Sequence, residues 1–257
     1  MEQAQKPPVW TECVDGVWTI TLNRPQVLNA MTIEMFYLLR DAIEQGAREE
    51  QADVVLLRGA GGNFCSGADL SVLGAMSEKA QADEALTVIN EFLTRLHHMP
   101  KPVIAMVEGA AVGAGLNLAL HADFVIATHH AVIQEPFVHI GLTTDFGGTY
   151  LLPRLVGIAQ AKRLALLGEK LSGTEAERIG LIYKAVDAEV LTEEVEKLIA
   201  SVRRVPKQAF AVTKDGLTHA QGMDLEQSLA WEKVQQPALI SHPDFLALIQ
   251  AKRKKNQ

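Results

Sequence analysis

The chain has 257 residues, of which 48% are hydrophobic and 21% are charged, a composition typical of a globular protein with a large core. The chain has 24 Lys and Arg residues and 31 Asp and Glu residues. The resulting net charge of -7 argues against a broad basic surface that could bind nucleic acid or an anionic membrane. Two cysteines without a CxxC pair, and histidines without an HExxH pattern, favour neither a disulfide framework nor a metal site.

Strands and helices alternate in the first part of the chain. Residues 17–22 form a β-rich alternating run that predicts a strand, and Thr32 is expected to cap the helix that follows it. Three further runs are nearly all apolar, which predicts strands buried on both faces: residues 53–58, 103–107 and 123–127. Helical spacing of apolar residues is found before the third strand, over 85–96, and after it, over 116–121. The pattern predicts a layered α/β fold.

Near residue 200 the pattern changes to helices alone. Apolar residues at helical spacing predict three amphipathic helices, over residues 206–218, 225–235 and 243–252, separated by Gly222 and Pro237. We therefore expect a core of residues 1–200 and a helical region of residues 201–257, joined without a flexible linker.

The ends of the chain carry no targeting signal that we can identify. The first eight residues lack the basic and apolar regions of a signal peptide, and no apolar run approaches the ~20 residues of a membrane span. We expect a cytoplasmic protein. The basic run from Lys252 to Lys255 is expected to be a solvated end, with one cation available to meet a phosphate.

Two segments rich in glycine and other small residues could bring the backbone close to a ligand. Residues 63–70 follow a predicted strand, and their alternative role is an ordinary loop with Asp69 in the first turn of a helix. Residues 108–117 place glycines before a helix, where unpaired N–H groups favour an anion or oxyanion. Their spacing is not GxGxxG, so a dinucleotide site is poorly supported, and tight packing of helix on strand is the alternative.

Two side chains invite a catalytic interpretation. Cys65 has a nucleophilic thiol, but the sequence places no histidine to activate it, and a small packed residue is the better interpretation. Asp145 stands just before a short helical stretch, so it is either the N-cap of that helix or a functional carboxylate.

Four segments, in this order, resemble the crotonase (enoyl-CoA hydratase/isomerase) superfamily over essentially the whole chain. They are residues 22–30, 64–70, 109–115 and the turn 147–149. The resemblance implies a spiral of ββα units, followed by C-terminal helices that build a homotrimer, usually paired into a hexamer. It implies an acyl-CoA thioester substrate and no further cofactor, since coenzyme A is part of the substrate, with neither nucleic acid nor a membrane as a partner.

The resemblance also implies the residues of the site. The N–H groups of Ala68 and Ala114 would form an oxyanion hole, and Ala114 replaces the glycine of many relatives, which is tolerable because only its N–H is required. Arg24 and Lys252 are expected near the phosphates, and Phe137 and Phe146 as apolar walls. The residues expected to bind the acyl group or coenzyme A are Arg24, Gln26, Val27, Leu28, Cys65, Ser66, Gly67, Asp69, Leu70, Gly113, Asn117, Phe137, Phe146 and Lys252.

The resemblance also shows that this chain lacks two acidic residues of the enoyl-CoA hydratases. Enoyl-CoA hydratases carry two glutamates, at the positions of Asn117 and Phe137. An amide and a phenyl ring cannot exchange protons at neutral pH, so water addition by paired carboxylates is not supported. Asp145 remains, at a position where some isomerases and the chlorobenzoyl-CoA dehalogenases carry an aspartate. The dehalogenases also carry a Trp in place of Phe137 and a His in place of Asn90. This chain has neither residue, so dehalogenation is disfavoured.

Residues 141–154 resemble most the 1,2-epoxyphenylacetyl-CoA isomerases of phenylacetate breakdown. The sequence therefore predicts an acyl-CoA isomerase that shifts a double bond or rearranges an epoxide, with Asp145 as its single acid/base. The alternatives are an enoyl-CoA hydratase of fatty-acid or aromatic-acid degradation and a non-catalytic protein that binds CoA thioesters. An RNA-binding member of the superfamily is disfavoured by the net charge of -7.

Overall fold

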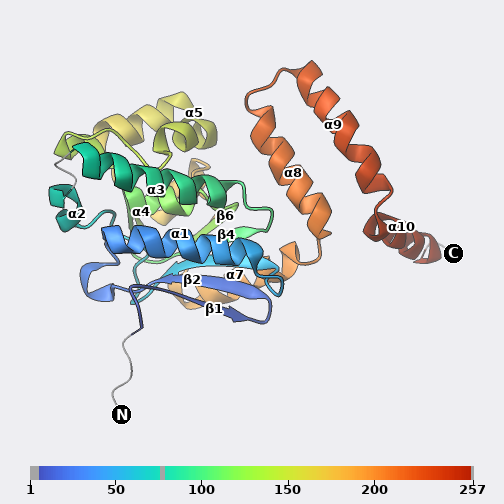
Figure 1. Ribbon diagram of the computed structural model, residues 1–257, viewed down its shortest axis with the longest axis horizontal. Helices are drawn as coiled ribbons and strands as arrows, with labels where there is room; N and C mark the ends of the chain where they lie inside the picture. Colours follow the sequence, from blue (N-terminus) through green and yellow to red (C-terminus); the bar gives the residue numbers. More distant parts are fainter. Residues whose placement is uncertain (1–5, 76–78, 256–257) are drawn as a thin grey trace, which may run out of the picture. The chain divides into compact units, whose positions relative to one another are not determined.

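The computed structural model describes residues 6–75 and 79–255, and the chain divides into two compact units, Met1–Ile199 and Ala200–Gln257. The first unit is built on a six-stranded sheet with the order β1-β2-β3-β4-β6-β8 (Figure 1). β1 and β2 are antiparallel, and every other neighbouring pair is parallel. The strands are β1 (Val9–Val14), β2 (Val17–Leu22), β3 (Val54–Gly59), β4 (Val103–Val107), β6 (Phe124–Thr128) and β8 (Lys184–Val186).

The predicted strands β2, β3, β4 and β6 are confirmed, and most of their residues are buried. β1 was not predicted, because four of its six residues are only partly buried and its alternation is weak. Asp15 and Gly16 have φ of 46° and 73° and form the two-residue turn between β1 and β2. An Asp-Gly pair between two β-rich runs is a strong hairpin signal, so the sequence did contain the information.

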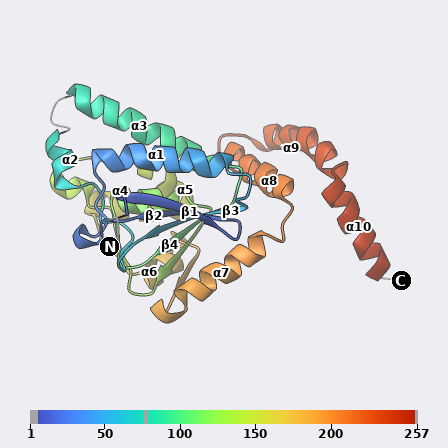
Figure 2. The same cartoon turned by 60° about the horizontal axis from the view of Figure 1, so that its bottom comes forward.

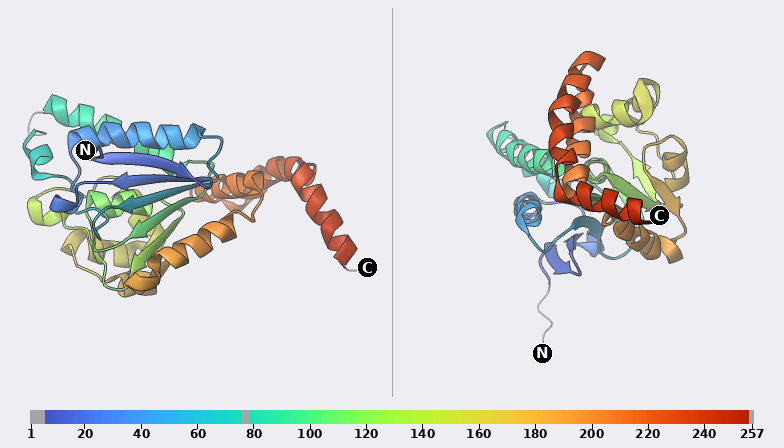
Figure 3. Two further views of the ribbon diagram at one scale, coloured as in Figure 1. Left: turned by 90° about the horizontal axis from the view of Figure 1, so that it is seen from below. Right: turned by 90° about the vertical axis from the view of Figure 1, so that its right-hand side faces the viewer.

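Helices cover both faces of this sheet (Figure 2). α1 (Ile33–Arg48) and α3 (Lys79–His97) lie side by side on one face, whereas α6 (Gly173–Arg178) and α7 (Leu191–Val202) lie on the other. The left view of Figure 3 shows the strands stacked between these two layers. The predicted cap of α1 is confirmed, since the Met35 N–H donates to Thr32 Oγ1 at 3.3 Å.

A second, smaller sheet lies beside the first. β5 (Ala110–Val112) and β7 (Val132–Gln134) pair in parallel, and single bridges extend the pairing from Cys65 to Ala111 and from Ile133 to Leu171. α4 (Ala114–Leu120) starts two residues after β5 and contacts β4, β6 and α5 (Gly148–Leu167). This arrangement brings the two predicted glycine-containing loops to one place.

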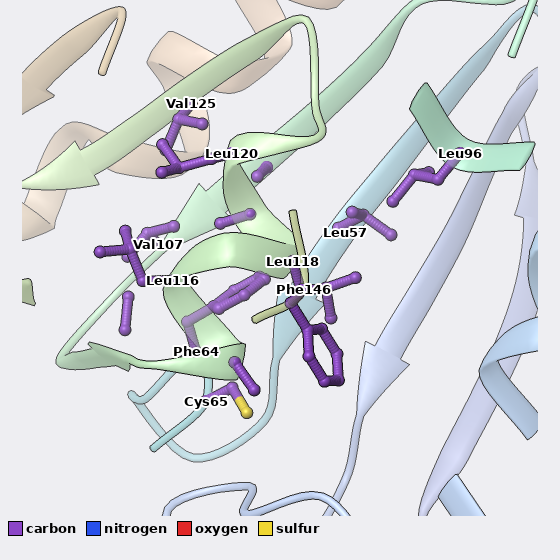
Figure 4. Close-up of a cluster of buried hydrophobic side chains, with 14 of the residues drawn as sticks. Leu57, Phe64, Cys65, Leu96, Val107, Leu116, Leu118, Leu120, Val125 and Phe146 are labelled. Carbon is purple, nitrogen blue, oxygen red and sulfur yellow. The ribbon is translucent and has the colours of Figure 1, made fainter. Parts of the chain in front are cut away.

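The core of the first unit surrounds α4. All seven residues of this helix are buried. Figure 4 shows Leu116 and Leu118 of α4 among buried side chains that include Phe64 and Phe146. A fully buried short helix is held by packing rather than by its own propensity, which makes it a rigid support for the loop before it.

The second unit contains α8 (Lys207–Ala220), α9 (Leu225–Ile240) and α10 (Pro243–Lys255). The prediction that a helix ends before Pro237 is wrong: α9 continues through Pro237 to Ile240. Proline removes the N–H that would bond the carbonyl four residues back, so α9 lacks one hydrogen bond in its last turns. Among residues 6–75 and 79–255, no helix is both long and apolar enough to cross a membrane.

Candidate active site

The loop after β3 carries the first candidate N–H donor, that of Ala68. Two neighbours hold the loop in place. The Cys65 N–H donates to the Ala110 carbonyl at 2.8 Å, and the Met31 N–H donates to the Gly67 carbonyl at 2.8 Å. No oxygen in the described part of the chain accepts the Ala68 N–H, so this donor can bind the oxygen of a ligand.

The start of α4 carries the second candidate donor, that of Ala114. The first N–H groups of a helix have no intrahelical partner, and no described residue accepts the Ala114 N–H. The two loops approach closely: a Cβ on Gly115 would lie 2.3 Å from the Cys65 carbonyl oxygen, so only glycine fits there. The Ala114 nitrogen lies 3.9 Å from the position that a Cβ on Gly67 would occupy, next to Ala68. Both unpaired N–H groups therefore lie in one region.

Asp145 lies in the loop that precedes α5. The N-cap of α5 is Gly147, which receives no capping side chain, so the interpretation of Asp145 as a helix cap is wrong. The Asp145 carbonyl accepts the Gly148 N–H at 2.9 Å. Its Oδ1 atom is buried and has no hydrogen-bond partner among the described residues. Burial raises the pKa of the Asp145 carboxyl to about 6, opposed in part by a hydrogen bond from its own backbone.

A second buried carboxyl, that of Glu135, lies close to Asp145 and was not predicted from the sequence. Its side chain is 1% exposed. The Thr144 hydroxyl donates to Glu135 Oε2 at 2.8 Å, and Asn117 Nδ2 lies 3.3 Å from the same oxygen. Burial is the main cause that raises the pKa of Glu135 to about 8, and the charge of Asp145 raises it further. An acidic residue directly after β7 was the signal that could have revealed it.

Asn117 connects the two carboxyl-bearing segments. It is fully buried, and its Nδ2 donates to the Asp145 carbonyl at 2.8 Å and to Thr144 Oγ1 at 3.2 Å. A Cβ on Gly148 would lie 2.3 Å from Thr144 Oγ1 and 2.6 Å from Asn117 Nδ2, so the network requires glycine at this position. Asn117 thus binds the loop that carries the acid, whereas sequence analysis expected it to contact the ligand.

Phe146, directly after Asp145, holds the loop to the core. Its ring packs against Phe36 and Phe92, at centroid distances of 5.9 and 6.1 Å. Its carbonyl lies 3.0 Å from His121 Nε2, and burial lowers the pKa of His121 to about 4. The neutral imidazole therefore donates its Nε2–H to this carbonyl. The apolar surroundings of Asp145 come from this packing, and a role of Phe146 as a substrate wall stays a prediction.

Phe137 is the other predicted wall. It is 8% exposed, and its Cζ atom lies 3.4 Å from the position that a Cβ on Gly113 would occupy. Its ring therefore lies against the residue that precedes Ala114. Phe137 and Gly113 thus lie in contact, and a role of Phe137 as a substrate wall stays a prediction.

The two loops expected to bind coenzyme A also meet. The Ser66 N–H donates to the Leu28 carbonyl at 3.0 Å, and the Ser66 hydroxyl donates to the Val27 carbonyl at 3.4 Å. Gln26, Val27 and Leu28 are exposed. The backbone of both loops is thus joined beside the unpaired Ala68 N–H, with side chains available at the surface.

The ionic residues expected at this site already have partners. Arg24 Nη1 donates to Asp69 Oδ2 at 2.8 Å and to the Ala30 carbonyl at 2.7 Å. The pKa of Asp69 is lowered to about 2, first by the Ser71 backbone N–H and then by Arg24. Asp69 therefore holds the start of α2 (Leu70–Ala75), and a role of Arg24 at phosphates stays a prediction.

Leu70 and Lys252 are the two other residues expected to contact coenzyme A. The side chain of Leu70 lies outside the described residues. Lys252 lies on α10 of the second unit and is exposed. Contacts of either residue with coenzyme A stay predictions.

The structure does not favour Cys65 as a nucleophile. Burial raises the pKa of the Cys65 thiol to about 12, so the thiol stays protonated at neutral pH. Residues 6–75 and 79–255 contain no group of three or more His, Cys, Asp or Glu side chains that could hold a metal ion. The two carboxyls of the site, Asp145 and Glu135, are the groups whose pKa is moved toward neutral pH.

Comparisons with known proteins identify the family of this chain. The family model described as enoyl-CoA hydratase/isomerase matches residues 12–256. The chain is 38% identical to 1,2-epoxyphenylacetyl-CoA isomerase of Escherichia coli over 221 residues, covering 85% of this chain and 84% of that protein. It is 32% identical to crotonyl-CoA hydratase of Syntrophomonas wolfei over 212 residues, covering 82% and 81%.

A solved structure shares the fold over nearly the whole chain. The enoyl-CoA hydratase of Bacillus anthracis superimposes with a TM-score of 0.91 and 30% identity, covering 97% of both chains. The predicted crotonase-like α/β fold is thereby confirmed. Since relatives named as isomerases and as hydratases both match, the specific reaction is a separate question.

Proposed function

The chain belongs to the enoyl-CoA hydratase/isomerase family and is an enzyme that acts on acyl-CoA thioesters, and we propose that within this family it is an isomerase. The reaction would be the migration of a double bond in an enoyl-CoA, or the rearrangement of an epoxide, through an enolate. One observation carries the proposal: Asp145 presents a buried carboxyl oxygen that has no hydrogen-bond partner among the described residues, and its pKa of about 6 suits proton transfer near neutral pH.

The two unpaired N–H groups would bind the thioester oxygen. A proton leaving a carbon conjugated to the thioester creates negative charge on that oxygen, and the donors of Ala68 and Ala114 would stabilise it. One such donor is worth about 3 kcal/mol of transition-state energy in other enzymes. This lowers the barrier, but it does not move the proton.

Asp145 would move the proton. As a carboxylate it takes a proton from one carbon, and as the acid it returns the proton to another carbon two bonds away. Water should be excluded from the intermediate by two aromatic rings. Phe146, next to Asp145 in the chain, packs against Phe36, and the ring of Phe137 lies beside Gly113. No cofactor is required, because coenzyme A arrives with the substrate and the reaction is redox-neutral.

Hydration is the second candidate, and Glu135 is the observation that favours it. Asn117 and Phe137 occupy the positions where hydratases carry glutamates, but Glu135 supplies a second buried carboxyl close to Asp145. Two carboxyls could hold and activate a water molecule. We favour isomerisation because burial raises the pKa of Glu135 to about 8 and keeps this carboxyl neutral near pH 7, whereas activation of water needs a carboxylate.

Substrate assays distinguish these possibilities. A 3-enoyl-CoA, a 2-enoyl-CoA and 1,2-epoxyphenylacetyl-CoA are incubated with the wild-type protein, and chromatography separates isomers of equal mass. Formation of an isomer supports the proposal, formation of a 3-hydroxyacyl-CoA alone supports the hydratase, and no product with retained binding supports a non-catalytic thioester-binding protein.

The Asp145→Asn variant tests the acid/base assignment. Asn keeps the shape of the side chain and removes the base, so isomerisation should fall by at least about 1,000-fold while folding and thioester binding are retained. Full activity of this variant would contradict the assignment.

A further inference from the structure

Glu135 is a buried carboxyl that the proposed mechanism does not use. It lies at the end of β7, which belongs to the small sheet beside α4. No cation is in contact with it among residues 6–75 and 79–255: its hydrogen-bond donors are the hydroxyl of Thr144 and the amide of Asn117. The charged group that acts on it is Asp145, which has the same sign. An uncompensated buried carboxylate is costly, so the neutral acid is the stable form.

The geometry also indicates which oxygen carries the proton. Oε2 accepts the Thr144 hydroxyl at 2.8 Å and lies 3.3 Å from Asn117 Nδ2, so its lone pairs are occupied. Oε1 is buried and has no partner among the described residues. Oε2 thus serves as an acceptor for two segments at once, and Oε1 is the oxygen left to carry the proton.

These two segments carry the reacting groups. Thr144 directly precedes Asp145, and Asn117 belongs to α4, whose first residue is Ala114. Asn117 Nδ2 also donates to the Asp145 carbonyl at 2.8 Å. Glu135, Thr144 and Asn117 thus form one network between the helix that presents an oxyanion donor and the loop that presents the acid/base.

We propose that Glu135 is a positioning residue: as a neutral carboxylic acid, it fixes the Asp145 loop to α4 and so sets the separation between the proton-transferring carboxylate and the Ala114 N–H. This inference rests on the proposed function in assigning roles to Asp145 and Ala114. It goes beyond that function because the chemistry requires only one carboxyl and says nothing about a second. Misplacement of a catalytic group by about 1 Å can cost 100-fold in rate.

Three substitutions separate positioning from proton transfer. Glu135→Gln keeps an oxygen acceptor and a neutral side chain, so we expect kcat to fall by less than about tenfold. Glu135→Leu leaves Thr144 and Asn117 without their acceptor, so kcat should fall by about 100-fold while KM changes by less than about threefold. Thr144→Val removes the donor and should lower kcat in the same direction. Glu177→Gln, on the exposed surface of α6, is the matched control and should leave both parameters unchanged.

The outcomes that overturn the proposal are distinct. If Glu135→Gln is as inactive as Asp145→Asn, Glu135 transfers a proton and is not a positioning residue. If Glu135→Leu keeps full kcat, the network has no role in positioning.

A substrate-free measurement keeps this test apart from the proposed reaction. The infrared carbonyl band of a protonated carboxylic acid should be present in the wild-type protein at pH 7 and absent in Glu135→Gln. Hydrogen exchange at residues 145–148 should accelerate in Glu135→Leu and not in Glu177→Gln. If these results hold and no isomer is formed from any substrate, the proposed function fails while the network stands. Absence of the band in the wild type would overturn the neutral acid.

Discussion

Asp145 shows how one residue can be costly for folding and useful for chemistry. Its Oδ1 atom is buried without a partner in the part of the chain that the structure describes, and burial raises the pKa of its carboxyl from 3.8 to about 6. The native state therefore binds a proton more readily than the unfolded chain does, and ionisation of Asp145 destabilises the fold. The same shift makes the carboxylate a stronger base near neutral pH.

The rate of isomerisation should depend on pH through Asp145. Only the ionised carboxyl removes a proton, so kcat/KM should rise about tenfold per pH unit below pH 6 and level off above it, since the pKa is about 6. A pH profile measured with saturating and with dilute 3-enoyl-CoA tests this. A flat profile between about pH 5 and 7 would contradict Asp145 as the base.

Glu135 should make stability fall as the pH rises. Its pKa is about 8 in the fold against an ordinary value of 4.5, so its stabilising contribution is complete below pH 4.5 and is lost as the pH rises through 8. Glu135→Gln does not titrate, so the variant should gain on the order of 1–4 kcal/mol in unfolding free energy relative to the wild type between about pH 5 and 9. Urea unfolding at several pH values measures this difference. Glu177→Gln should show no such trend, and a constant difference for Glu135→Gln would contradict a buried neutral acid.

At the level of elements, the site depends on three segments that meet around α4. The loop after β3 is held by β5, the loop before α5 is held by Asn117, and α4 itself is buried on all sides. Glycine at positions 115 and 148 permits these contacts, because a Cβ would lie 2.3 Å from a neighbouring oxygen at each. Rigid support of this kind keeps N–H donors aimed at one point, which is what electrostatic stabilisation requires.

The donor at the start of α4 can be removed without removing the helix. Ala114→Pro deletes the N–H, and proline is tolerated at the first position of a helix. We expect kcat for isomerisation to fall by about 100- to 1,000-fold with the thermal midpoint nearly unchanged. Ala114→Gly keeps the N–H and is the matched control. Equal activity of the two variants would contradict the role of this donor.

At the level of the whole molecule, the second unit exposes many apolar side chains. Leu217, Leu225 and Val234 are 68%, 68% and 72% exposed, and no residue of α8 or α9 is buried within the described chain. Exposed apolar surface of this extent is typical of a surface that another protein covers. A homotrimer, or a hexamer of two trimers, is our prediction for the assembly.

Sedimentation tests the assembly. The wild type should sediment as a trimer or hexamer at micromolar concentration, and Val234→Asp should shift it toward smaller species because a charge enters the apolar surface. Glu226→Gln, exposed on the same helix, should not change the sedimentation. A stable wild-type monomer would refute the prediction.

Local sequence determined most of the elements and the family. Uninterrupted apolar runs such as residues 103–107 indicate strands covered on both faces, and Thr32 before an apolar periodicity predicts a helix start, because both signals depend on neighbours in the chain. The four matching segments pointed to the enoyl-CoA hydratase/isomerase family before any contact was known. Strand β1 was not predicted, although the Asp15-Gly16 pair is a sequence signal for the hairpin that β1 forms with β2.

Only the tertiary structure determined which carboxyl groups lie in the site and how they are protonated. The sequence allowed Asp145 to be either a helix cap or a functional carboxyl, and the structure excludes the cap because α5 begins at Gly148, with Gly147 as its N-cap and no capping side chain. Glu135 looked like an ordinary residue after a strand, and its partners lie 18 and 9 positions away, at Asn117 and Thr144. A carboxyl acquires its protonation state from burial and from the charges that surround it, and these depend on segments distant in sequence, so no local pattern could have revealed the pair of acids.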